Sequence, residues 1–87
     1  MPRRVIWSDE ARADVRAIDR DTALRLLRSL DRFLRTNAGN VKQLEGYDPP
    51  LFRLRTGPWR LIYRHQGEEA IEVVRVRNRR EAYRNLS

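Results

Sequence analysis

Apolar and polar residues alternate along residues 51–63 (LFRLRTGPWRLIY), which is the pattern of half-buried β-strands. Gly57 and Pro58 interrupt the run, so a β-hairpin with a two-residue loop is expected. With that loop Thr56 faces Trp59, and the pairing continues outward to Phe52 and Tyr63. Because side chains alternate between the two faces of a strand, this register predicts one apolar and one basic face.

The two predicted faces differ in charge. The apolar face carries Phe52, Leu54, Trp59, Leu61 and Tyr63. The other face carries Arg53, Arg55, Arg60, Ile62 and Arg64. Like charges directly opposite each other destabilise a sheet by up to ~1 kcal/mol per pair. The basic face is therefore expected either to extend its arginines into water or to hold an anion between them.

Two amphipathic helices are expected before the hairpin. Ser8 is a candidate N-cap, and apolar spacing predicts a first helix over residues 9–18. A new cap at residues 19–21 precedes a second helix over residues 22–35, with Gly39 as a candidate left-handed C-cap. The apolar stripe of the second helix consists of Ala23, Leu26, Leu27, Leu30, Phe33 and Leu34. Its other side, with Arg25, Arg28, Arg32 and Arg35, is either a solvated face or a second anion-binding surface.

The remaining segments complete an α+β domain. Residues 3–7 are a strand candidate, residues 41–50 a loop with Leu44 in the core, and residues 69–77 a long strand. Alternation slips between Val73 and Val74, which indicates a bulge or burial on both faces. Placing Val74 on the apolar face leaves Arg75 and Arg77 with the hairpin arginines. With a short C-terminal helix over residues 78–86, the order is β-α-α-β-β-β-α, a two-helix layer packed on one face of a small antiparallel sheet.

Length and composition restrict the function. A chain of 87 residues is expected to form one domain, residues 1–87. With no cysteine and one histidine, neither a metal nor another cofactor is expected. No apolar run is long enough to span a membrane, and the start is unlike a signal peptide, so a cytoplasmic location is expected. The net charge of +7, carried by arginine except at Lys42, favours a polyanion or an acidic protein as partner.

Three segments in order along the chain resemble motifs of RelE/ParE-superfamily toxins, the toxic half of bacterial toxin–antitoxin pairs. Residues 42–46 (KQLEG) resemble the family's K-x-L-x-G. Residues 54–64 (LRTGPWRLIYR) resemble its strand pair LR-x-G-x-[YW]-R-[LV]-[IV]-Y, and residues 74–84 (VRVRNRREAYR) its ending V-x-x-[GH]-x-R-[RK]-E-[VA]-Y. The resemblance implies a compact fold with two helices on an antiparallel sheet, and an acidic antitoxin as partner.

The resemblance also implies functional residues. Arg60 matches the strand arginine that binds the scissile phosphate. Arg79 matches the arginine that stabilises developing charge or assists the leaving group, and Tyr83 matches the tyrosine that stacks on or orients the nucleotide. These are the candidate catalytic residues. The candidate RNA-binding residues are Arg53, Arg55, Arg75 and Arg77. RelE-like members cleave mRNA on the ribosome, whereas ParE-like members inhibit DNA gyrase by binding it without catalysis.

The sequence departs from the nuclease pattern where a general base is needed. Leu51 stands where RelE has a lysine, Arg53 does not readily lose a proton, and the motif histidine or glycine is changed at residues 77–78. Tyr83 and Glu45 remain as candidate bases. The favoured hypothesis is a metal-independent mRNA endoribonuclease neutralised by its antitoxin. A gyrase inhibitor and a decayed toxin that survives as a binding partner stay open as alternatives.

Overall fold

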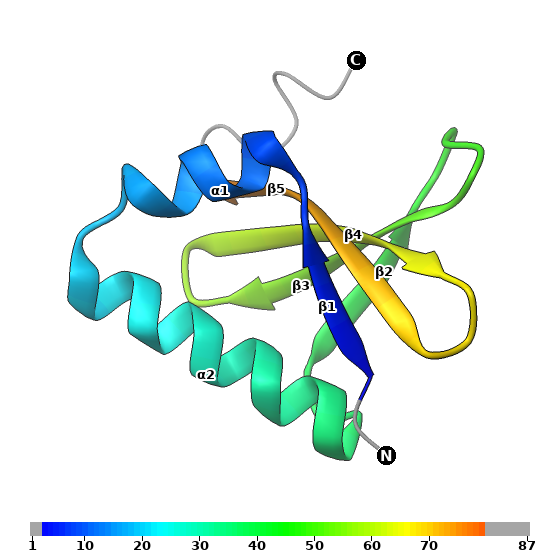
Figure 1. Ribbon diagram of the computed structural model, residues 1–87, viewed down its shortest axis with the longest axis horizontal. Coiled ribbons are helices and arrows are strands. Elements are labelled where there is room, and N and C mark those ends of the chain that lie inside the picture. The colour runs from blue at the N-terminus through cyan, green and yellow to red at the C-terminus, as the bar shows by residue number, and fades with distance from the viewer. Residues whose placement is uncertain (1–2, 80–87) are drawn as a thin grey trace.

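The structure is a computed structural model that describes residues 3–79 of the chain. Its elements in chain order are β1 (Arg4–Trp7), α1 (Asp9–Arg16), α2 (Arg20–Thr36), β2 (Asn40–Leu44), β3 (Leu51–Thr56), β4 (Trp59–Gln66) and β5 (Ala70–Asn78). The strands form one sheet in the order β1-β5-β4-β3-β2, and the helices pack on one side of it (Figure 1). The predicted α+β fold class, with a two-helix layer on a small sheet, is confirmed.

The sheet differs from the predicted one in two respects. The prediction of a loop over residues 41–50 is wrong for the first part of that range. Asn40–Leu44 form β2, which pairs antiparallel with β3 at the edge of the sheet. Most residues of this edge strand are exposed, so its polar composition resembles that of a loop. β1 runs parallel to β5, which makes the sheet mixed. From residue 80 onward the predicted C-terminal helix lies outside the described residues, and Asn78 is the last residue of β5.

Side-chain caps begin both helices. The Ser8 hydroxyl accepts a hydrogen bond from the backbone N–H of Ala11 at 3.0 Å, and the Asp19 carboxylate accepts one from Thr22 at 3.0 Å. Both predicted N-caps are therefore confirmed. The hydrogen bond from Thr22 lowers the pKa of Asp19 below its ordinary value of 3.8, because it stabilises the ionised carboxylate.

The end of α2 differs from the prediction. Asn37, with a φ of 58°, is the left-handed C-cap, so the assignment of this role to Gly39 is wrong. Glycine is needed at position 39 for a steric reason, because a Cβ added there would lie 2.8 Å from Cδ1 of Leu54. The chain approaches β3 closely after the helix, and glycine permits that approach.

The central hairpin has the predicted register. Thr56 pairs with Trp59 across the two-residue loop, and the pairing continues to Phe52 and Tyr63. Gly57 in the loop has a φ of 57°, which glycine adopts without strain. Local alternation and the Gly-Pro break were therefore sufficient to align β3 and β4.

The predicted irregularity in β5 is also present. The register between β4 and β5 shifts after Ile62, so that Val76 faces Leu61 but Val73 faces Tyr63. Val73 is fully buried and belongs to the core cluster, whereas Val74 does not. The prediction of Val74 on the apolar face is wrong, because the bulge turns Val73 there instead.

The core lies between the sheet and the helices. It combines the α2 stripe with the apolar face of β3, β4 and β5, and its buried members are Ala11, Leu26, Leu30, Phe33, Leu54, Leu61, Tyr63, Ile71, Val73 and Val76. Full burial of one such aliphatic side chain contributes about 1.5–3 kcal/mol to folding. The rings of Phe33 and Tyr63 lie 5.9 Å apart, which links α2 to β4.

α1 covers the part of β5 that β1 does not reach. β1 pairs with residues 70–73 of β5, so the continuation past the bulge needs other partners. Ser8 donates from its backbone N–H to the Val73 carbonyl at 3.1 Å and from its hydroxyl to the Val74 carbonyl at 2.8 Å. The Asp14 carboxylate accepts the N–H of Val76 at 2.9 Å. These hydrogen bonds attach α1 to β5, and they satisfy backbone N–H and C=O groups of β5 that no neighbouring strand pairs with.

Candidate nucleic-acid interface

The sheet face turned away from the core, here called the reverse face, carries two rows of side chains. Residues directly opposite each other in neighbouring strands point to the same face, so the register defines the rows. The first row consists of Asn40, Arg55, Arg60 and Arg77, one each from β2 to β5. The second row consists of Lys42, Arg53, Ile62 and Arg75. This register confirms the expected division of the hairpin into an apolar and a basic face.

Arg55, Arg60 and Arg77, which we call the basic row, place positive charges on three adjacent strands. Opposed side chains of neighbouring strands have Cβ atoms roughly 4.5–5.5 Å apart, and each like-charged pair costs up to ~1 kcal/mol. An anion between the guanidinium groups removes that cost. Because a guanidinium can donate two parallel hydrogen bonds to one phosphate, the row suits a phosphodiester backbone.

Arg60 is the central member of the basic row and the most enclosed. It is 6% exposed, and its Nη1 donates long hydrogen bonds, of 3.5 Å to the Gly57 carbonyl and 3.4 Å to the Trp59 carbonyl. Its Nε is buried without a hydrogen-bond partner in the described part of the chain. A buried cationic donor with incomplete hydrogen bonding is stabilised by an incoming anion.

The hairpin loop also fixes the residues that follow the basic row. Asn78 pairs with Trp59, and the backbone N–H of Arg79 donates to the carbonyl of Pro58. Arg79 is exposed at this end of the sheet. The structure therefore brings the backbone of Arg79 to the loop that directly precedes β4, and the role of the Arg79 side chain stays a prediction. Tyr83 lies outside the described residues, and its role stays a prediction.

Within the described part of the chain, Arg75 and Arg64 of the reverse face are each paired with a carboxylate. Arg75 donates from Nε and Nη2 to the two oxygens of Asp14, at 3.0 and 3.2 Å. This hydrogen bonding raises the pKa of Arg75 above its ordinary value. Arg64 lies 2.6 Å from Glu72. Arg75 was grouped with the RNA-binding arginines by sequence, but its guanidinium is directed to α1, which distinguishes it from the basic row.

Sequence reasoning missed Lys42 as part of this face. Lys42 lies opposite Arg53 and extends the positive surface onto β2. The only sequence signal for β2 was one apolar residue followed by one polar residue, Val41 and Lys42. Leu44, which was expected in the core, is buried with 9% of its surface exposed, and it lies opposite Leu51 on the reverse face.

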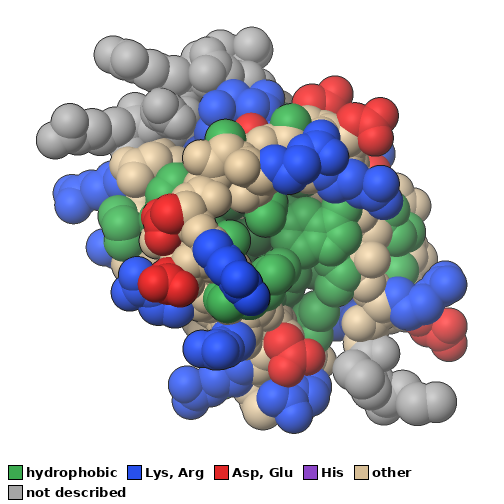
Figure 2. Space-filling view, turned by 60° about the vertical axis from the view of Figure 1, so that its left-hand side comes forward, with side chains coloured by type: hydrophobic (Ala, Val, Ile, Leu, Met, Phe, Trp, Pro, Cys, Tyr) green, Lys and Arg blue, Asp and Glu red, His purple; other side chains and the backbone are tan. Residues whose placement is uncertain are grey.

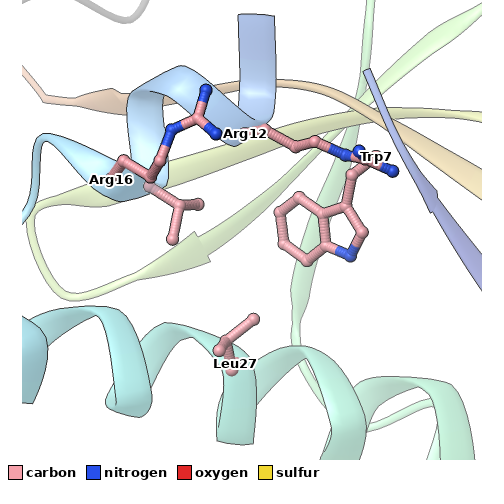
Figure 3. A pocket seen from close by; sticks show the side chains of 5 residues that line it. Trp7, Arg12, Arg16 and Leu27 are labelled. Atoms are coloured by element: carbon pink, nitrogen blue, oxygen red, sulfur yellow. The ribbon is translucent and has the colours of Figure 1, made fainter. Parts of the chain in front are cut away.

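A second surface feature is an apolar groove between α1, α2 and β1, which we call the helical groove. Two hollows share Trp7 and Leu27. One has a volume of about 330 Å³ and is also lined by Arg12, Val15 and Arg16 (Figure 3). The other, of about 340 Å³, is also lined by Arg3, Val5, Leu30, Asp31 and Leu34. Figure 2 shows hydrophobic side chains gathered in a hollow with Lys and Arg side chains around it.

Residues 3–79 contain no group of three or more acidic or histidine side chains placed to hold a metal ion. Over the same range, neither helix has the length and apolar character needed to cross a membrane.

Several solved toxin–antitoxin complexes contain a chain with this arrangement of elements. The RelE–RelB complex of Pyrococcus horikoshii OT3 is similar with a TM-score of 0.72 at 23% identity, over 94% of this chain and 100% of that one. The toxin–antitoxin complex RelBE2 of Mycobacterium tuberculosis is similar with a TM-score of 0.78 at 23% identity, over 91% and 93%. The RelB–RelE complex of Methanococcus jannaschii is similar with a TM-score of 0.73 at 17% identity, over 94% and 99%. At these identities the likeness establishes the fold.

The family follows from the sequence itself. The family model described as the ParE toxin of type II toxin-antitoxin system, parDE, matches residues 5–83. The chain therefore belongs to this family and is a type II toxin of the RelE/ParE superfamily. A search of curated protein sequences finds no significant match.

Proposed function

We propose that this toxin is a metal-independent endoribonuclease that cleaves mRNA on the ribosome. The observation that carries the proposal is the basic row, whose three arginines are aligned across β3, β4 and β5 on the reverse face. Its central residue, Arg60, is buried with an unpartnered Nε among the described residues. A bound phosphate relieves the repulsion within the row and supplies an acceptor for that donor.

The basic row suits cleavage of RNA by its own 2′-hydroxyl. The 2′-hydroxyl gives up its proton as its oxygen attacks the adjacent phosphorus, and the bond from phosphorus to the 5′-oxygen breaks. The 5′-oxygen takes up a proton and leaves as a 5′-hydroxyl, and a 2′,3′-cyclic phosphate remains. In this proposal Arg60 and Arg79 stabilise the charge that develops on the phosphorane, and Tyr83 positions the nucleotide. The neighbouring backbone is held by Arg53, Arg55 and Arg77. Arg75, which is paired with Asp14, supports the strand instead of contacting RNA.

The cognate antitoxin is proposed to bind the helical groove. Trp7, Val15 and Leu27 supply apolar contact area, while Arg12 and Arg16 supply positive charge at the rim. An amphipathic helix flanked by acidic residues matches both properties. The three similar structures are toxin–antitoxin complexes, which supports an antitoxin as the partner.

The nuclease proposal is tested by inducing the full chain in growing bacteria without its antitoxin. We expect growth arrest together with mRNA cleavage whose positions follow the reading frame. Arg55→Gln and Arg77→Gln should weaken both effects, because each removes one charge of the basic row. Arg28→Gln removes the same charge from an exposed position of α2 and is the matched control. Undiminished arrest and cleavage in both row variants would overturn the proposal.

Inhibition of DNA gyrase by protein binding is the second candidate function, and one observation favours it. Among the described strand residues of the reverse face, Glu72 is the one carboxylate, and Arg64 engages it at 2.6 Å. Arginine does not give up its proton, so the described strand residues of β3, β4 and β5 on this face offer no unengaged carboxylate as a base for the 2′-hydroxyl. A toxin that acts by binding needs no such base. Induction of the DNA-damage response without mRNA cleavage, in the same cultures, would support gyrase inhibition.

A further inference from the structure

Trp59 has an unusual position at the start of β4, directly after the hairpin loop. It packs against the core cluster but stays partly exposed, and it lines two hollows. The larger, of about 360 Å³, lies toward α2 and includes Thr22, Arg25 and Leu26. The smaller, of about 200 Å³, lies between the end of α1 and β5.

The smaller hollow adjoins the basic row. Its lining consists of Asp14, Ala17, Ile18, Trp59, Val76 and Arg77. Arg77 belongs to both the hollow and the row, and Trp59 directly precedes Arg60 in β4. Trp59 points to the helix side of the sheet and Arg60 to the reverse face, so the connection between hollow and row is Arg77. Arg77 lies in the part of β5 that β1 does not pair with, so a nucleotide whose phosphate lies on the row can place its base around this edge into the hollow. The larger hollow shares no residue with the row.

We propose that the smaller hollow is a nucleobase subsite, in which one base of the RNA stacks on the indole of Trp59. This inference rests on the proposed RNA-cleaving function and adds a contact to it. Proteins that read single-stranded RNA stack unpaired bases on aromatic side chains and on arginine planes, and Trp59 and Arg77 provide both. Ile18 and Val76 supply apolar walls for the edge of a planar ring.

The subsite accepts one base and discriminates little between bases. Its volume is below the roughly 300–1,000 Å³ of pockets for drug-sized ligands, which restricts it to a single ring system. Asp14 is its one carboxylate among the described lining residues. Three hydrogen bonds, two from Arg75 and one from Val76, already occupy most of the acceptor capacity of that carboxylate. Stacking is therefore expected to supply affinity, with little selection by hydrogen bonding.

The two tryptophans of the chain allow a direct test of the subsite. In a Trp7→Phe variant of the full chain, Trp59 is the single tryptophan fluorophore. The probe is a short RNA with 2′-O-methyl groups, which cannot be cleaved through the 2′-oxygen. We expect saturable quenching of Trp59 emission by this probe. No quenching is expected with a probe of the same backbone that carries abasic residues. Trp59→Phe, with Trp7 as the reporter in the helical groove, is the matched control and should show no quenching.

Affinity measurements separate the subsite from the basic row. Stacking of one base is worth about 1–3 kcal/mol, so Trp59→Leu should weaken binding of the base-containing probe roughly 5- to 150-fold. The same variant should leave binding of the abasic probe unchanged. Fluorescence anisotropy of end-labelled probes at about 50 mM salt, where phosphate contacts are strong, measures both affinities.

Each other outcome overturns a defined part of the model. Tight binding of the RNA probe without quenching of Trp59 emission refutes the subsite. An equal loss of affinity for the base-containing and the abasic probe in Trp59→Leu also refutes the subsite. Both results remain compatible with phosphate binding by the basic row. Failure of both probes to bind the full chain refutes the RNA-binding function, and the subsite with it.

Discussion

Asp14 connects α1 to β5, and its replacement should measurably destabilise the protein. The carboxylate accepts hydrogen bonds from Nε and Nη2 of Arg75 and from the N–H of Val76, at 3.0, 3.2 and 2.9 Å. The side chains of Asp14 and Arg75 are 13% and 23% exposed, so water replaces these partners only in part. Asp14→Ala leaves a guanidinium and a backbone N–H without their acceptor at the same time.

The magnitude follows from these two losses. A buried N–H without an acceptor costs about 1–3 kcal/mol. Loss of a fully buried ion-pair partner costs about 3–5 kcal/mol and of an exposed one at most about 1 kcal/mol, so about 1–2 kcal/mol suits this partly exposed pair. The sum is about 2–5 kcal/mol. Since about 1 kcal/mol shifts the Tm of a domain of this size by about 4–8 °C, the Tm should fall by roughly 8 °C or more.

Thermal unfolding followed by circular dichroism measures this effect, and the chain offers a matched control. Asp31→Ala also breaks an Asp–Arg pair, with Arg35, but both side chains are 63% exposed, so the loss should stay within about 0.5 kcal/mol. Asp14→Asn should fall between the two, because it keeps an acceptor for the N–H of Val76 and removes the charge. A fall in Tm for Asp14→Ala no larger than for Asp31→Ala would refute the account of how α1 is fastened.

Three further predictions concern other parts of the molecule. Gly39→Ala should cost about 1–3 kcal/mol in urea unfolding, because the new Cβ meets Cδ1 of Leu54 at 2.8 Å, and Leu54→Val in the same chain should recover part of the loss; full stability of the single variant would contradict this. Because the pKa of Asp19 is lowered, its ionised form stabilises the fold above pH 3.8, and this contribution is lost as the pH falls below 3.8. Asp19→Asn keeps the cap without the charge, so the urea midpoint of this variant should change less between pH 5 and pH 3 than that of the unmodified protein. An equal change in both proteins would argue against the effect. Leu27→Asp should weaken antitoxin binding at least tenfold in calorimetry while growth arrest persists. Leu24→Asp, which is on α2 but does not line the helical groove, should leave antitoxin binding unchanged. An equal loss of antitoxin affinity in both variants would exclude the groove from the antitoxin interface.

Features that depend on neighbours in the sequence were predictable. Ser8 and Asp19 cap their helices because a hydroxyl or carboxylate reaches an N–H three residues further along the chain. The register of β3 and β4 follows from alternation and a two-residue loop. Both signals lie within one segment of the chain, so they require no knowledge of the rest of the fold.

Features that depend on distant partners were not predictable. The polar residues of β2 become a strand because β3 offers unpaired backbone groups beside them, and β1 becomes parallel because it meets β5 at the far edge of the sheet. The helix end after α2 was misplaced for a related reason. Gly39 is needed to approach Leu54, a contact that no local pattern reveals.

The same division holds for the candidate site. Alternation alone placed Arg55 opposite Arg60, and so determined that the protein would present a basic face. Tertiary structure decided which carboxylate Arg75 contacts. A bulge and a helix 61 positions away direct Arg75 to Asp14, while Arg77 stays in register with Arg60. The physical reason is that side-chain direction is set by the strand itself, whereas neutralisation of a charge depends on whichever carboxylate the fold brings within hydrogen-bonding distance.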